Sequence, residues 1–110
     1  MAFDAALAER IRGELRGGRG MVEKKMFGGI AFLLNGNMCV GVHKDEMIVR
    51  LSPDETDAAL KQKHTRVFDL TGRPMKGWLL VAPTGVRTAS GLERWIARSR
   101  AFAASLPKKK

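Results

Sequence analysis

Few residues of this 110-residue chain have side chains suited to catalysis. Cys39 lies in an apolar segment, and His43 and His64 stand apart from it. Cys39 and His43 would share a strand face, but at ~3.3 Å per residue they would be about 13 Å apart, too far to bind one metal ion. No base accompanies the thiol and no Gly-x-Ser-x-Gly elbow is present. We therefore expect no catalytic residues, no metal and no cofactor, and a protein that is not an enzyme.

The glycine pair Gly28-Gly29 raises the question of a phosphate-binding loop. It has the spacing of neither the P-loop nor the dinucleotide fingerprint, and an alternating apolar segment follows it where those loops need a helix. The pair is better interpreted as a bend between a short first strand and a hairpin. The acids Asp54 and Glu55 follow Ser52-Pro53, where negative charge favours a helix N-terminus, so capping explains them without catalysis.

The charge of the chain suggests a class of partner. Twenty Lys and Arg against eleven Asp and Glu give a net charge of +9, and the excess is concentrated after residue 86. A polyanion such as nucleic acid would be attracted to such a surface, but a soluble protein with a basic surface fits the same numbers. Trp78 and Trp95 could stack on bases, but both are predicted to pack in the core. No aromatic residues interleave with the surface cations in a known recognition pattern. The candidate contacts for nucleic acid or a protein partner are Lys24, Lys25, Arg50, Arg73, Lys76, Arg94 and Arg98.

The length allows one domain, which we place at residues 1–106, followed by a basic tail at 107–110. No apolar run approaches the roughly 20 residues that cross a bilayer, and the N-terminus carries an acid where a secretory signal would be basic. The lone cysteine has no disulfide partner. We therefore expect a cytoplasmic protein with no membrane contact.

Three helices are predicted from spacing and caps. Apolar residues recur every four positions from Phe3 to Leu15, which predicts a helix over about residues 3–16. Ser52-Pro53 with Glu55 has the pattern of a capping box and predicts a helix to about Lys63. The last helix ends before Pro107, and its apolar stripe is Leu92, Trp95, Ile96, Ser99, Phe102, Ala103 and Leu106.

The strands are predicted around one strong turn. Asn35-Gly36 favours a type I′ turn, which makes residues 28–34 and 37–43 a hairpin. Lys44-Asp45 then returns the chain as a strand at 47–51. Two further strands are expected at 66–70 and 77–82, joined by a turn at 71–74. The expected hairpin pairs are Leu34 with Asn37, Leu33 with Met38, Phe32 with Cys39, Ala31 with Val40 and Ile30 with Gly41.

Together these elements predict an α+β fold with two layers. An antiparallel sheet of about five to six strands is packed with three helices, in the order α-β-β-β-α-β-β-α.

Two motifs carry a family resemblance. Lys25-Met26-Phe27-Gly28-Gly29 precedes Asn35-Gly36, and Arg73-Pro74-Met75-Lys76-Gly77-Trp78 comes later. In these segments the chain resembles the N-terminal domain of the TfoX/Sxy family, over about residues 5 to 105. The resemblance implies the same α+β fold and supplies no catalytic residues. The motif residues interpreted as structural are Met26, Phe27, Gly28, Gly29, Pro74, Met75, Gly77 and Trp78, with Phe27 turned toward the helices.

The larger members of that family are similar to regulators of natural competence that act with the cyclic-AMP receptor protein, and they carry a second, helical domain. This chain is expected to consist of the N-terminal domain alone. The resemblance thus implies a non-enzymatic regulatory or interaction module that works through an unidentified protein partner. Direct nucleic-acid binding through the basic surface is the alternative, and the sequence leaves a monomer and a homodimer both open.

Overall fold

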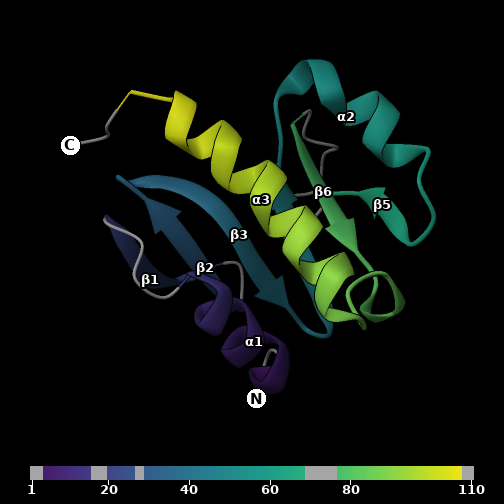
Figure 1. Cartoon of the computed structure of the whole chain (residues 1–110), viewed down its shortest axis with the longest axis horizontal. Coiled ribbons are helices and arrows are strands. Elements are labelled where there is room, and N and C mark those ends of the chain that lie inside the picture. Colours follow the sequence, from purple (N-terminus) through teal and green to yellow (C-terminus); the bar gives the residue numbers. More distant parts are fainter. Residues whose placement is uncertain (1–3, 16–19, 27–28, 69–76, 108–110) are drawn as a thin grey trace.

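The computed structural model describes residues 4–15, 20–26, 29–68 and 77–107. Three helices and a six-stranded antiparallel sheet are found in this part of the chain, which confirms the predicted α+β class and arrangement (Figure 1). The elements are α1 (Ala5–Leu15), β1 (Met21–Met26), β2 (Gly29–Leu34), β3 (Asn37–His43), β4 (Glu46–Arg50), α2 (Pro53–Leu60), β5 (Thr65–Val67), β6 (Trp78–Val81), a 3₁₀ turn η1 (Pro83–Gly85) and α3 (Ala89–Ser105).

The sheet has the strand order β1-β2-β3-β4-β6-β5. β1 is the short first strand expected before the glycine bend, and it forms one edge of the sheet. α1 and α3 lie over the same face, with α3 running diagonally across β3 and β4 (Figure 1). The main core fills the space between this face and the helices, and a smaller apolar cluster lies on the opposite face of the sheet.

The turn at Asn35-Gly36 has the predicted type I′ geometry, with φ of 53° and 84° at its two residues. The pairs Leu34–Asn37 and Leu33–Met38 are as predicted. The three predicted pairs beyond them are wrong by one residue, because a β-bulge shifts the register: Phe32 pairs with Val40, Ala31 with Gly41 and Ile30 with Val42.

The bulge has a simple physical cause. Without it, Gly41 and His43 would face the helices, and Val40 and Val42 would face away. The extra residue, Cys39, turns both valines into the core between sheet and helices, where they are fully buried. The larger apolar area buried in this way favours the bulged register over the regular one.

The helix ends differ slightly from those predicted. α2 ends at Leu60 instead of about Lys63. The Ser52 hydroxyl accepts a hydrogen bond from the Asp54 amide at 3.3 Å, two residues on, and not from Glu55 as a capping box would have it. α3 begins at a cap that was not predicted from the sequence. The Thr88 hydroxyl accepts a hydrogen bond from the Gly91 amide at 3.0 Å.

Side chains tie distant segments together. The Arg10 guanidinium on α1 donates to the carbonyl oxygens of Val86 at 2.7 Å and Arg87 at 3.2 Å, in the segment that leads into α3. On the same helix, Arg12 donates two hydrogen bonds to the Glu23 carboxylate on β1, at 2.7 and 2.8 Å. These bonds to Arg12 lower the pKa of Glu23 below its ordinary value.

The last two strands are shorter than predicted, at Thr65–Val67 and Trp78–Val81. The predicted turn at 71–74 and the end of the predicted strand at 69–70 lie outside the described residues. Pro83 ends β6, as predicted, and opens the 3₁₀ turn.

Candidate interaction surface

The candidate contact residues fall into separate groups. Lys24 and Lys25 are exposed on β1, at the edge of the sheet. Arg94 and Arg98 lie one turn apart on α3, and Arg50 ends β4. Arg73 and Lys76 lie outside the described residues. Arg50 and Arg98 are half-buried and Arg94 is exposed, and the sequence did not indicate which of these cations the fold brings near one another.

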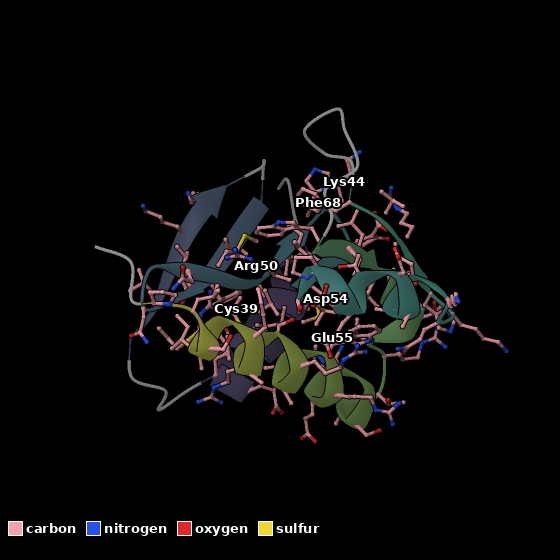
Figure 2. All side chains as sticks on the ribbon, turned by 90° about the horizontal axis from the view of Figure 1, so that it is seen from above. Cys39, Lys44, Arg50, Asp54, Glu55 and Phe68 are labelled. Atoms are coloured by element: carbon pink, nitrogen blue, oxygen red, sulfur yellow. The ribbon has the colours of Figure 1, made fainter. Side chains whose placement is uncertain are left out.

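Arg50 is the candidate with the most specific surroundings. Its guanidinium carbon lies 5.1 Å from the centroid of the Trp78 ring and 5.4 Å from that of Phe102. Trp78 is the residue paired with Arg50 on β6, whereas Phe102 reaches the same point from α3. We call Arg50, Trp78 and Phe102 the arginine–aromatic cluster. Figure 2 shows Arg50 on the sheet side of α3, with Asp54 and Glu55 on the neighbouring α2.

The pairing of β3 with β4 ends beside this cluster. The pairing of β3 with β4 stops at Val40–Val49, so Arg50 is paired with β6 only. Immediately before Val40 stands Cys39, the extra residue of the bulge. The bulge thus coincides with the place where β3 and β4 cease to pair and where Phe102 of α3 approaches Arg50.

The electrostatic state of Arg50 is unusual for a half-buried cation. In the described part of the chain, no hydrogen bond or ion pair to its guanidinium is found, and its contacts are the two aromatic rings. Burial lowers its pKa from the ordinary value, because removing the cation from water disfavours the charged form. Arginine keeps its charge in proteins nonetheless, so the cluster holds a cation without a carboxylate.

Arg94, Arg98 and Phe102 follow one another at intervals of four residues and so lie along one ridge of α3. We call these three residues the α3 ridge. The Arg98 guanidinium carbon lies 5.2 Å from the centroid of the Trp95 ring, and Arg94 is exposed. Phe102 continues this ridge after the two arginines and also contacts Arg50. The sequence had predicted Phe102 as a core residue, because it belongs to the apolar stripe of the last helix.

Other arginines have internal partners. Arg10 binds backbone carbonyls and Arg12 binds Glu23 and Glu9. Arg66 donates to the Glu46 carboxylate at 2.6 and 2.8 Å, joining β5 to β4. Arg50, Arg94 and Arg98 have no such partner among the residues described. The described part of the fold thus contains arginines that hold elements together and arginines without a carboxylate or carbonyl partner.

The reactive side chains do not form a common site. Cys39 is completely buried, and burial raises the pKa of its thiol to about 12, with Arg100 acting weakly in the opposite direction. His64 Nδ1 lies 2.7 Å from the Thr84 hydroxyl, in an exposed contact between two loops. His43 ends β3 and is half-buried. Within the described ranges, no group of three His, Cys, Asp or Glu residues could hold a metal ion.

Two motif glycines have clear structural requirements. A Cβ atom at Gly29 would lie 1.9 Å from the Val42 carbonyl oxygen, so the backbone of β2 approaches β3 more closely than any other residue would allow. Gly77 has φ of +93°, and its carbonyl accepts a hydrogen bond from the Leu51 amide at 2.7 Å. Phe27, Gly28, Pro74 and Met75 lie outside the described residues, as does the side chain of Met26.

The chain is a small α+β domain, because its first and last helices cover one face of an antiparallel sheet. The match to a family model then places it more narrowly. The chain belongs to the TfoX N-terminal domain family, whose model matches residues 14–103. The searches of curated proteins and of solved structures each found no match. None of the helices in the described ranges has the length and apolar character needed to cross a membrane.

Proposed function

We propose that this TfoX N-terminal domain is a non-enzymatic regulatory module that acts by binding a protein partner, with a role in transcriptional or competence regulation. The observation that carries the proposal is the separation of its arginines. Arg10, Arg12 and Arg66 hold elements of the fold together, whereas Arg50, Arg94 and Arg98 have no carboxylate or carbonyl partner among the described residues, and Arg50 and Arg98 contact aromatic rings instead. Family membership supports a regulatory role for such a surface.

The state of the reactive groups agrees with binding in preference to catalysis. A thiol with a pKa of about 12 is almost wholly protonated near neutral pH and is a poor nucleophile. The His64 ring is engaged with the Thr84 hydroxyl in an exposed contact. These features support an interaction module because they leave the unpaired arginines as the most distinctive chemistry on the surface.

Affinity capture tests this proposal. The tagged protein, incubated with extract of the cells it comes from and treated with nuclease, should retain a specific protein that is identified by mass spectrometry. The matched control is the same protein with Arg50, Arg94 and Arg98 all replaced by glutamine, which should lose that partner while keeping its fold by circular dichroism. The proposal would be contradicted if the parent protein retained no more protein than the control variant. It would also be contradicted if proteins were retained only when nuclease was left out.

Direct nucleic-acid binding is the second candidate, and the α3 ridge favours it. Arg94 and Arg98 lie one turn apart, without carboxylate partners in the described chain, on a protein of net charge +9. Such an array is suited to phosphates, whose binding releases counterions and weakens with salt. Fluorescence anisotropy with duplex DNA and with RNA, from about 50 to 200 mM salt, tests it. In the variant Arg94→Gln/Arg98→Gln, the slope of log K against log salt concentration should be smaller by about 2. No binding near about 50 mM salt would rule this candidate out.

A further inference from the structure

Arg50 is not explained by the stability of the fold. Removing a cation from water is costly unless a carboxylate or several hydrogen bonds replace the lost hydration. The two rings near Arg50 provide cation–π attraction, which is worth about 0.5–2 kcal/mol in general, and they provide no strong hydrogen-bond acceptor. An apolar residue at the end of β4 would pack between the same rings without that cost. The presence of the cation therefore calls for another role.

The surroundings of Arg50 restrict what it could bind. Trp78 and Phe102 come from different elements, and both are half-buried, so they present apolar surface beside the guanidinium. Contacts with two rings limit the rotamers of the long arginine side chain, so less entropy is lost when a ligand binds. The five N–H donors of the guanidinium match the two oxygens of a carboxylate in a planar, bidentate pair.

We propose that the arginine–aromatic cluster is the docking site for a peptide segment of the protein partner, in which one carboxylate pairs with Arg50 and adjacent apolar side chains cover Trp78 and Phe102. This inference rests on the proposed function and specifies the chemistry of the partner. The segment therefore contains an acidic residue with apolar residues next to it. Arg98 stands one helical turn from Phe102, so a second acidic residue of the segment would meet a second cation.

A peptide suits this cluster better than a nucleic-acid backbone does. Each strand of duplex DNA carries a charge about every 3.4 Å and is bound best by several exposed cations in a row, whereas Arg50 is a single half-buried cation. Base stacking needs a whole ring face, and a face of each ring already contacts the Arg50 guanidinium, whereas an apolar side chain can pack on the part of each ring that remains exposed. A single cation beside two aromatic rings is complementary to a single carboxylate that has apolar side chains next to it.

Side-chain NMR on the whole protein tests the site directly. The Nε–H resonance of Arg50 is assigned as the one missing from the spectrum of Arg50→Lys. The probes are the capped peptide Leu-Glu-Phe-Glu-Leu, the same peptide with glutamine in place of glutamate, and a single-stranded oligothymidylate. We expect the acidic peptide to shift the Arg50 resonance and the glutamine peptide to leave it unchanged.

Affinities from anisotropy of the labelled acidic peptide complete the test. Arg50→Lys keeps the charge but loses the planar pair, and should weaken binding at least about tenfold. Arg50→Met keeps much of the side-chain volume and should abolish binding, while thermal unfolding shows whether both variants still fold. Arg87→Gln is the matched control, because it removes one exposed arginine away from the cluster, and it should change the affinity less than about twofold.

Several results would overturn the proposal. One is a peptide that binds without moving the Arg50 resonance, or equally well to Arg50→Lys. Another is a shift caused by oligothymidylate and not by the acidic peptide, which would assign the cluster to nucleic acid. Failure of this inference is distinguishable from failure of the proposed function, because a partner captured equally by Arg50→Lys would leave the regulatory module standing without this site.

Discussion

At the scale of single residues, the structure separates side chains by whether their chemistry is used inside the protein. Cys39 was the most reactive residue type in the sequence, and it is the bulged residue of β3, completely buried. Arg50 was one of seven candidate contacts, and only the fold shows that two aromatic rings surround it. Function at this scale depends on environment more than on residue type.

The Cys39 thiol should be unreactive in the folded protein. Burial raises its pKa from 9.0 to about 12, so the thiolate fraction near pH 8 falls roughly a thousandfold. Labelling with a chromogenic disulfide reagent should be slow in buffer and rapid in urea. The same shift means that the folded state holds this proton more tightly than the unfolded state, so stability should decline as the pH rises above about 9. Rapid labelling of the folded protein would contradict the buried assignment.

Gly29 should tolerate no side chain. Gly29→Ala would place a Cβ atom 1.9 Å from the Val42 carbonyl oxygen, and we expect a loss of at least about 2 kcal/mol in the free energy of unfolding. The control is Gly13→Ala on α1, where nothing lies within 4 Å of the new Cβ atom, and a gain of about 0.5–1 kcal/mol is expected. Urea denaturation measures both. Equal effects at the two positions would show that close approach to β3 is not what requires Gly29.

At the scale of elements, one buried hydroxyl joins α2 to the start of β6. The Thr56 side chain is 3% exposed, and its hydroxyl accepts a hydrogen bond from the Gly77 amide at 2.8 Å while donating to the Ser52 carbonyl at 3.1 Å. Gly77 in turn bonds the Leu51 amide, so the end of β4, α2 and the glycine before Trp78 are connected. This connection positions Trp78 opposite Arg50.

Thr56→Val should therefore disturb more than α2. The change preserves the shape of the side chain but leaves the Gly77 amide without its acceptor, and we expect a loss of about 1–3 kcal/mol. Thr56→Ser is the control, since it keeps the hydroxyl and should restore the hydrogen bond, losing only the methyl contacts. Denaturant unfolding gives the stabilities. A valine variant as stable as the parent protein would show that the hydroxyl does not support this junction.

Local signals predicted most of the elements. Asn35-Gly36 specified its turn because both residues tolerate positive φ, and the apolar stripe of α3 specified that helix. The register of β3 could not be predicted, because the bulge at Cys39 depends on which side chains the helices cover. The arginine–aromatic cluster was also missed, since its members are 28 and 52 residues from Arg50 along the chain and no short-range pattern links them.

At the scale of the whole molecule, the sheet has a long edge at β1 that carries charged residues. β1 pairs with β2 on one side only, and Val22 is 56% exposed there. Such an edge can pair with another strand unless charged residues discourage it. Glu23, Lys24 and Lys25 occupy the centre of the strand and are exposed.

Lys24 and Lys25 should be dispensable for folding and important for solubility. Lys24→Ala/Lys25→Ala should change the free energy of unfolding by no more than about 0.5 kcal/mol, because neither residue has an internal partner among those described. Lys24→Val/Lys25→Val should favour pairing between edges and increase association at high concentration. Sedimentation velocity across a concentration series compares the two. Identical behaviour of the valine and alanine variants would show that the lysines do not protect the edge.

The contact between Arg10 and the Val86 carbonyl spans 76 residues of chain. During synthesis on the ribosome, α1 emerges long before the segment that its arginine will bind, and before α3, which shares the core with it. The packing of the N-terminal helix therefore cannot be completed until almost the whole domain has left the exit tunnel. We therefore expect this protein to complete its folding late in translation or after it, when α1 and α3 can pack together.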